Sequence, residues 1–410
     1  MATRRGGGGP GSGRSRVERW LPVFAFAVLV RGIYWAVVLP GWKPQADADQ
    51  YVRLSHSLAA GRGFALVYPQ LEMHATAFRP PLYPLLLTPG SLVFGHALWP
   101  VRLVSVLLGS VVVVLVGMLA ARIAGRTAGL IAPIVVAVYP PLLANDTVSL
   151  SEPLALSLLL GAILLVDENR PVPAGIAVGA LLLTRPNGYL VLAILVAWTW
   201  RRVGWRPAAG LAGVAFLVFV PWLVRNQVQV GTWRPTTSDG LTLAAVYGKP
   251  AQNAGTFVDP VFSSDYDDLE DRLAQFDEAS WNAKLTREAV AGLKGNPRYL
   301  GHVVWQNAAG YFEIDPSLNV FPEVNDGRSM RFRSDTLVLF YAVSLVGLAG
   351  LVRNRRDERV IVLALIVGQF VLLSLVLVAP PRLRAPFDVA MCVGLGVLLG
   401  PILDRRRTAD

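Results

Sequence analysis

The sequence has little charge and almost no cysteine for its length. Of its 410 residues, 16% are charged, 53% are hydrophobic, four are histidine and one, Cys392, is cysteine. A single cysteine excludes an intrachain disulfide, and its position in an apolar run gives no sign of thiol chemistry. A soluble chain of this length would carry more charge and show alternating polar faces. These shortages therefore argue against a soluble enzyme.

Apolar runs of roughly 20 residues recur along the chain instead, each long enough to cross ~30 Å of hydrocarbon. They predict an all-α, polytopic membrane protein with about ten transmembrane helices. The expected spans are about 20–39, 101–121, 130–143, 154–166, two within 172–200, 208–224 and three between 335 and 410.

The net charge of +10 comes mostly from arginines in short clusters between the apolar runs. Such clusters are typical topology signals, because basic loops stay on the cytoplasmic side of a membrane. We therefore expect both termini in the cytoplasm, a location in the plasma membrane, and no nucleic-acid partner.

The same reading divides the chain into four regions. Residues 1–19 are expected to form a disordered, basic cytoplasmic tail. A transmembrane module over 20–224 includes a long first outer loop (41–99). A second outer region, 225–334, is expected to form an extracytoplasmic subdomain, and 335–410 to form the C-terminal transmembrane helices.

The run 172–200 could be one helix of about 43 Å or two shorter ones. It contains Arg185-Pro186-Asn187-Gly188 at its middle. Because proline and glycine interrupt helices, we expect two short helices hinged at this point.

The outer region contains helical spacing from 279 to 311, interrupted by "GNPRYL". Its apolar face is expected to pack on the membrane surface. The residues on that face are Trp281, Leu285, Leu293, Trp305 and Phe312.

The first outer loop begins with "ADADQYVRLSHSLAAGRGF", which predicts a short amphipathic helix ending at Gly61 and Gly63. Asp47 and Asp49 lie at its start. Aspartate is a favoured N-cap residue, so one interpretation gives these two acids only a capping role. A capping carboxylate is held rigidly, however, and this leaves a catalytic role open.

Several arginines sit at the outer ends of apolar runs, against the positive-inside tendency. A single one of them could simply reach the interface with its long side chain. As a group they predict a phosphate site at membrane depth, because the guanidinium fork matches phosphate oxygens. They are Arg79, Arg185, Arg225, Arg382 and Arg384.

Glu152 lies where an outer loop enters the fourth predicted helix, and Arg31 lies inside the first. An unpaired charge there is costly, so Glu152 should pair with an arginine, face water or cap its helix. Arg31 should pair with a buried carboxylate. His56 and His74 are not spaced like a metal site, so we expect no required cofactor, although a divalent metal stays possible.

Taken together, these motifs resemble the polyprenyl-phosphate-dependent GT-C glycosyltransferases. The resemblance is to family 39, the type of the protein O-mannosyltransferases and the aminoarabinose transferase of lipid A. It rests on an acid four residues before Tyr51, then "L..G.GF", "RPPLYPLLL" with Tyr83, "LSEP", "LLTRPNG", "VPWLVRNQVQVGTWRPTTSDG" and "RLRAPFDV". We expect the chain to differ from larger relatives in having no sizeable C-terminal soluble domain.

The resemblance implies a GT-C bundle with an active site in the first outer loop. Asp47 matches the catalytic acid better than Asp49, Glu152 matches a second acidic position, and Arg79 matches the residue that contacts the lipid phosphate. Tyr51, Tyr83 and Arg185 are further site candidates, and Arg225, Arg382 and Arg384 are candidates for the donor phosphate.

The expected function is extracytoplasmic transfer of a sugar from a polyprenyl-phosphate donor to an acceptor hydroxyl, with inversion and an Asp general base. The acceptor could be a glycan, a lipid or a protein, and membrane lipids surround the enzyme. The alternative is a lipid or solute transporter or flippase without transferase activity. Transporter sites tend to lie near the midplane, whereas the ionisable residues here gather at helix ends.

Overall fold

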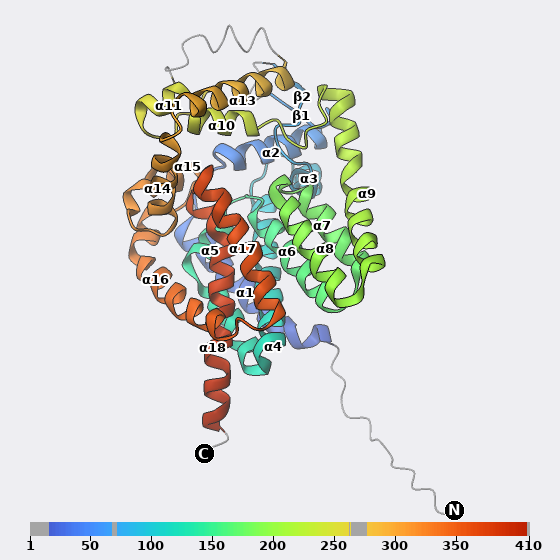
Figure 1. The fold of residues 1–410 in the computed structure, drawn as a ribbon, viewed down its shortest axis with the longest axis vertical. Helices are drawn as coiled ribbons and strands as arrows, with labels where there is room; N and C mark the ends of the chain where they lie inside the picture. The colour runs from blue at the N-terminus through green and yellow to red at the C-terminus, as the bar shows by residue number, and fades with distance from the viewer. Residues whose placement is uncertain (1–15, 68–71, 262, 264–276, 408–410) are drawn as a thin grey trace, which may run out of the picture.

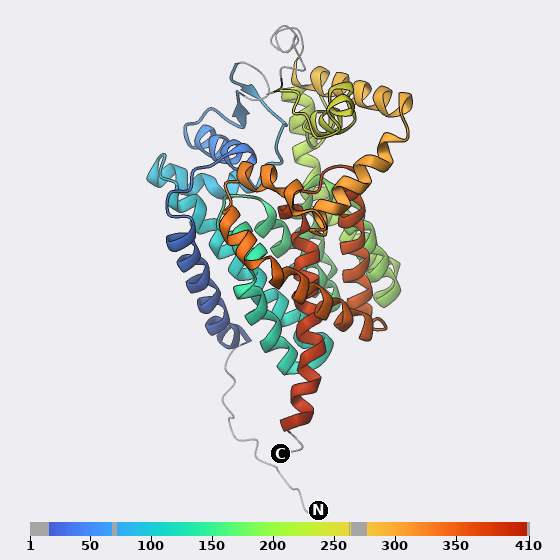
Figure 2. The same ribbon diagram turned by 90° about the vertical axis from the view of Figure 1, so that its left-hand side faces the viewer.

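The computed structural model describes residues 16–67, 72–261, 263 and 277–407 (Figure 1). Long helices form an upright bundle, and shorter helices with one small β-hairpin form a cap at its upper end (Figures 1 and 2). The all-α prediction is confirmed. Most of the predicted tail, 1–19, lies outside the described residues, and the rest of it begins α1.

Six helices in the described part are long and apolar enough to cross a membrane. They are α1 (Arg16–Val38), α4 (Trp99–Val138), α9 (Trp205–Val230), α16 (Met330–Arg353), α17 (Glu358–Val376) and α18 (Ala385–Arg407). This count is lower than the predicted ten. Two predicted spans are merged in α4, and three others correspond to helices shorter than 18 residues.

The continuous element α4 is in fact a helical hairpin. Gly125 has a φ of 83°, a left-handed conformation that breaks the helix. A methyl group on Gly129 would lie 2.6 Å from the Cβ of Ala121, so the two halves pack side by side. A turn thus lies between the predicted spans 101–121 and 130–143.

The run 172–200 is divided, as predicted. It contains α7 (Pro171–Leu182), a 3₁₀ turn η1 (Pro186–Gly188) and α8 (Tyr189–Val203). The interruption falls at Arg185-Pro186, because proline cannot donate to a preceding helical carbonyl. It leaves Arg185 in an extended conformation at the upper end of the bundle.

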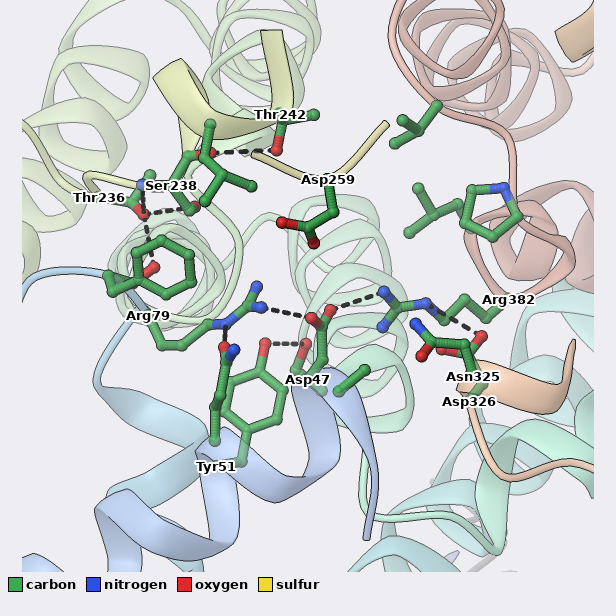
Figure 3. A pocket seen from close by; sticks show the side chains of 18 of the residues that line it. Asp47, Tyr51, Arg79, Thr236, Ser238, Thr242, Asp259, Asn325, Asp326 and Arg382 are labelled. Carbon is green, nitrogen blue, oxygen red and sulfur yellow. Dashed lines mark hydrogen bonds and ion pairs between the residues drawn. The ribbon is translucent and has the colours of Figure 1, made fainter. Parts of the chain in front are cut away.

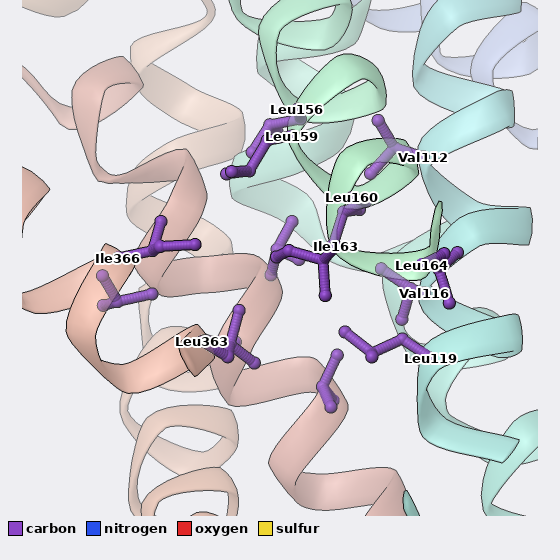
Figure 4. Packing of buried hydrophobic residues seen from close by; sticks show 14 of the residues in the cluster. Val112, Val116, Leu119, Leu156, Leu159, Leu160, Ile163, Leu164, Leu363 and Ile366 are labelled. Atoms are coloured by element: carbon purple, nitrogen blue, oxygen red, sulfur yellow. The ribbon is translucent and has the colours of Figure 1, made fainter. Parts of the chain in front are cut away.

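The bundle interior is a dense packing of aliphatic side chains (Figure 4). Side chains of α6 (Glu152–Asp167), including Leu160 and Ile163, lie between those of α4 and α17. In a bilayer, helix association depends on such close van der Waals packing rather than on transfer from water. Helices α16 and α18 lie in close contact at two glycines. A Cβ on Gly347 would lie 2.1 Å from the carbonyl oxygen of Met391, and one on Gly350 would lie 1.9 Å from that of Gly394.

The Arg31 side chain in α1 has a buried acidic partner, as expected. Its Nε and Nη2 lie 2.9 and 2.6 Å from one carboxylate oxygen of Asp146, the last residue of α5 (Pro140–Asp146). Arg31 is fully buried and Asp146 is 2% exposed. The pair therefore joins two helices without leaving an uncompensated charge.

The first outer loop supplies one half of the cap. It contains α2 (Ala46–Ala59), the hairpin of β1 (Ala65–Leu66) and β2 (His74–Ala75), and α3 (Leu82–Phe94). The second outer region supplies the other half, which comprises α10 (Asp239–Tyr247), α11 (Lys249–Ala254), α13 (Glu278–Gly295), α14 (Tyr299–Tyr311), η2 (Pro316–Asn319) and α15 (Val320–Asn325).

The apolar face of α13 packs within this cap. Trp281 and Leu285 are buried against Phe78 and Leu241, and so join the two outer segments. The expectation that these two side chains cover a membrane surface is wrong, because helical periodicity alone cannot tell which surface an apolar face meets. Trp305 of α14 is 64% exposed.

Both the start of α1 and the end of α18 lie at the end of the bundle opposite the cap (Figures 1 and 2). The described chain therefore begins and ends on one side of the bundle. The polar residues of the first outer loop lie on the other side, beneath α10 and α13.

Candidate active site

Asp47, in the first turn of α2, lies at the floor of a pocket at the capped end of the bundle (Figure 3). The preceding residue, Ala46, has a φ of 43°, a conformation that costs a non-glycine residue about 1–3 kcal/mol. This strained link directs the chain from α1 into α2. The rest of α2 is fixed by the buried side chains of Tyr51 and Leu54.

Neither Asp47 nor Asp49 caps α2. Gln45 occupies the N-cap position and its side chain makes no capping hydrogen bond. The interpretation of these acids as helix caps is therefore wrong. Their location two and four residues past the N-cap residue still suits the positive end of the helix dipole.

Both carboxylate oxygens of Asp47 are bound by arginines from other segments. Arg79, just before α3, donates through Nη2 to Oδ1, and its Nε donates to Gln50 at 2.6 Å. Arg382, in η3 (Pro381–Arg384), donates through Nη2 to Oδ2 at 2.6 Å. Two arginines that are distant from Asp47 in the sequence thus bind its carboxylate.

Arg382 also contacts two further acids. Its Nη1 lies 3.5 Å from Glu152, and its Nε lies 3.2 Å from Asp326, which follows α15. Glu152, at the start of α6, is only 3% exposed and forms a closer ion pair, 2.5 Å, with Arg185. We refer to Asp47, Arg79, Glu152, Arg185, Asp326 and Arg382 as the charged cluster.

Two tyrosines support the cluster from below. Tyr51 and Tyr83 pack edge to face with ring centroids 5.1 Å apart. The Tyr51 hydroxyl lies 3.2 Å from Ser151 Oγ, and the Tyr83 hydroxyl lies 2.7 Å from Ser105 Oγ. Both rings are buried and pack α2 against α3, and Tyr51 also lines the pocket.

The pocket above the cluster has a volume of about 1560 Å³. Small-ligand sites usually measure about 300–1,000 Å³, so this one has room for two substrates. Its walls come from α2, α10, α14 and the segments next to η1, η3 and α15. Asp47, Arg79, Arg185, Asp326 and Arg382 line it, whereas Glu152 lies behind the two arginines that contact it.

This architecture is similar to that of known proteins. Residues 78–224, less than half of the chain, match a family model described as dolichyl-phosphate-mannose-protein mannosyltransferase. No curated protein sequence matches the chain. The apo oligosaccharyltransferase of Archaeoglobus fulgidus aligns with 96% of this chain at a TM-score of 0.55 and 14% identity.

The chain has the GT-C fold. A second structure of the Archaeoglobus enzyme AglB, in complex with an inhibitory peptide and a dolichol-phosphate, aligns at a TM-score of 0.54 with 14% identity over 95% of this chain. ArnT from Cupriavidus metallidurans in the apo state is 18% identical over 94% of this chain and 78% of its own, at a TM-score of 0.44. The chain spans about half the length of the oligosaccharyltransferase, 52% and 51% in the two structures.

Within this GT-C fold, three predicted site residues lie apart from the charged cluster. Arg225 donates to the carbonyl oxygens of Thr76 at 2.5 Å and Phe64 at 2.9 Å, and so anchors the β-hairpin to α9. Arg384 is buried between Glu313 and Asp388. Asp49 points along α2 to an exposed partner, Arg53, at 2.5 Å.

Asp326 and Gln50 belong to the site but were not among the predicted residues. Gln50 lies within the motif used for the prediction, one turn from Asp47, and its helical spacing could have indicated it. Asp326 lies in "VNDGRS", which reads as an ordinary turn. No local pattern connects it to Arg382, so only the fold reveals the contact.

The cluster changes the acidity of its carboxyl groups. Burial alone would raise the pKa of Asp47, but Arg382 and Arg79 outweigh burial and hold it well below its ordinary value. Burial raises the pKa of Asp326 to about 7, although Arg382 and Arg328 act in the opposite direction. Asp47 and Asp326, which both contact Arg382, thus differ widely in pKa.

The acids of the charged cluster are engaged by arginines. Within the described ranges, no three or more His, Cys, Asp or Glu side chains are grouped closely enough to hold a metal ion. The cluster's acids each face a guanidinium instead. A divalent cation would have to displace these arginines, so we derive no step through a metal.

Proposed function

We propose that this chain is a membrane glycosyltransferase that moves a sugar from a polyprenyl-phosphate donor to an acceptor hydroxyl. The observation that carries the proposal is the position of Asp47, held between Arg79 and Arg382 at the floor of a large pocket. A carboxylate beside two guanidinium groups provides a proton acceptor and an anion site within one side-chain length.

In this proposal Asp47 is the general base. The acceptor oxygen attacks the anomeric carbon, the bond from that carbon to the phosphate oxygen breaks, and the lipid phosphate leaves with the electron pair. The hydroxyl proton passes to Asp47. Attack from the face opposite the phosphate would invert the anomeric configuration.

The arginines have two roles in this mechanism. They bind the donor phosphate and stabilise the charge that grows on it in the transition state. A phosphate carries more charge than a carboxylate, so its binding would weaken the interaction of Arg79 and Arg382 with Asp47. The pKa of Asp47 would then rise toward the range that suits a base, which ties the base to the presence of donor.

Arg185 and Glu152 have supporting roles in this proposal. Glu152 pairs with Arg185 at 2.5 Å and contacts Arg382 at 3.5 Å. These contacts hold Arg382 at the capped end of the bundle. Glu152 does not line the large pocket, so we assign it a positioning role. Tyr51 and Tyr83 position α2, and we assign Arg225 and Arg384 to the fold rather than to the donor phosphate.

We further propose a plasma-membrane orientation with both termini in the cytoplasm and the pocket outside. Arginine-rich turns follow α8 and α16, and the start of α1 and the end of α18 lie at that same end. Basic segments favour the cytoplasmic side. The acceptor, whether glycan, lipid or protein, would then enter from outside, and the donor from the membrane.

The test uses purified full-length protein in detergent and a panel of radiolabelled polyprenyl-phosphate sugars, with a cell-envelope extract as acceptor. We expect transfer from at least one donor by the wild type and none by Asp47→Asn, while both bind undecaprenyl phosphate. Absence of both binding and transfer in the wild type would refute the proposal. Movement of lipid across proteoliposomes without transfer would support the transporter alternative.

A further inference from the structure

Arg382 presents three nitrogens to three different carboxylates. Nη2 lies 2.6 Å from Asp47, Nε lies 3.2 Å from Asp326, and Nη1 lies 3.5 Å from Glu152. The guanidinium therefore has a carboxylate on every edge. A phosphate that binds to Arg382 must take the place of at least one of these acids.

Above about pH 7, where Asp326 is ionised, the charges of the cluster are balanced before any ligand binds. Its three carboxylates, Asp47, Glu152 and Asp326, match its three arginines, Arg79, Arg185 and Arg382. The neighbouring Arg328 is engaged with Glu323 at 3.2 Å. A phosphate monoester adds a charge of about −1.5 to −2, so its binding leaves the cluster with an excess of negative charge.

Of the two acids that both contact Arg382 and line the pocket, Asp47 and Asp326, Asp326 is held less firmly. Asp47 is bound through both oxygens, and Glu152 has a closer partner in Arg185. Asp326 is 4% exposed and lines the pocket, yet its Oδ2 and the Arg382 Nε opposite it make no hydrogen bond within their 3.2 Å contact. A phosphate that enters from the pocket therefore meets the Asp326 edge of Arg382 as the easier one to displace, because Glu152 lies behind the arginines.

We propose that Asp326 is a positioning residue for the donor phosphate: its carboxylate holds the Nε edge of Arg382 until the phosphate takes that place. The inference rests on the proposed function, because it concerns the phosphate of the same donor. On displacement, Asp326 takes up one proton from solvent and becomes neutral, which offsets part of the incoming charge. No covalent bond changes in this step.

The surroundings of Asp326 suit such a proton uptake. Two cations, Arg382 and Arg328, and two acids, Asp47 and Glu152, face it, and burial raises its pKa to about 7. Movement of Arg382 toward a phosphate would remove the larger of the two cationic influences. The protonated form is then favoured at neutral pH.

The test compares binding of undecaprenyl phosphate by the wild type and by Asp326→Asn between pH 6 and pH 8.5. The lipid phosphate itself ionises near pH 6 in both proteins, so the ratio of the two Kd values isolates Asp326. We expect the ratio of wild-type to variant Kd to be near one at pH 6 and to rise above pH 7 by up to about tenfold per pH unit. A ratio that stays constant, or a variant that binds more weakly at high pH, would overturn the inference.

A second measurement does not depend on the variant. Calorimetry in two buffers of different ionisation enthalpy gives the protons taken up on binding at pH 8, where the phosphate is already dianionic. We expect uptake by the wild type and less by Asp326→Asn and Asp326→Ala. No uptake by the wild type, or equal uptake by all three proteins, excludes Asp326 as the proton acceptor.

Asp239→Asn provides a matched control. Asp239 also lines the pocket, but its partner is Arg234, at 2.5 Å. This change should leave the pH dependence of Kd as in the wild type. If the wild type binds no undecaprenyl phosphate at all, the proposed function fails, whereas normal binding without the expected pH dependence overturns only the role of Asp326.

Discussion

Asp47 and Arg382 form a 2.6 Å ion pair although 335 positions separate them in the chain. The pair brings the first outer loop against the last outer turn, directly above the bundle. Because Arg79 binds the other oxygen of the same carboxylate, Asp47 is held in one orientation toward the pocket.

The first prediction concerns the base. Asp47→Asn should lower the rate of sugar transfer by about 10²–10⁴-fold, since an amide cannot accept the acceptor proton. Binding of undecaprenyl phosphate should persist, because both arginines stay in place. The control is Asp49→Asn, which breaks only a contact with the exposed Arg53. If the control loses activity and Asp47→Asn does not, Asp49 is the base.

A second prediction separates two arginines that the sequence could not distinguish. Arg382→Lys should raise the Kd for undecaprenyl phosphate by about ten- to a hundredfold, because one ammonium cannot replace three directed nitrogens. Arg225→Lys should leave that Kd unchanged and lower the thermal unfolding temperature, since Arg225 binds backbone carbonyls. Equal effects of the two changes on Kd would contradict the assignment.

The third prediction is a pH dependence of stability in the cap. His74 Nε2 lies 2.7 Å from Glu278, whose carboxylate also accepts from Thr76 Oγ1 at 2.6 Å and the Ala77 amide at 2.8 Å. Burial alone would lower the pKa of His74, but the hydrogen bonds to Glu278 and to the Glu72 carbonyl raise it above its ordinary value.

Because the folded pKa of His74 is raised, its contribution to stability is complete below about pH 6 and is lost as pH rises through the folded value. Thermal unfolding should therefore occur at a higher temperature at pH 6 than at pH 8. The difference should shrink in His74→Ala. An unchanged difference in that variant would mean that other groups cause it.

The fourth prediction tests the buried ion pair in the bundle. Asp146→Ala leaves Arg31 charged, buried and unpaired, and should lower the free energy of unfolding by about 3–5 kcal/mol. Asp49→Ala breaks an exposed pair and should cost about 0–1 kcal/mol. Unfolding in mixed detergent micelles would measure both. A loss at Asp146 no larger than that at Asp49 would contradict the burial of this pair.

The sequence predicts those parts of the site that depend on local pattern. Tyr51 and Leu54 give α2 its buried face. Gly61 and Gly63, with φ of 70° and 77°, directly follow the end of α2, as the sequence predicts. Arg79 follows from its place before two prolines. In each case a rule acts over a few residues, so the sequence contains all the information needed.

Other features depend on contacts between distant segments. Carbonyl oxygens bind Arg225, and every residue has a carbonyl, so no sequence pattern marks its structural role. The partner of Arg31 is 115 positions away, and Asp326 meets Arg382 only because α15 and η3 fold over the same pocket. Burial by tertiary packing likewise decides where Trp281 faces.

The construction of the charged cluster from both ends of the chain has a consequence during synthesis. Asp47 and Arg79 emerge early, but Arg382 lies in η3, after α17. A nascent chain that ends before η3 lacks the Arg382 guanidinium that three acids share. The acids already synthesised would then outnumber the arginines around the incomplete pocket. The proposed donor site is therefore complete only once η3 has been synthesised and has folded over the pocket.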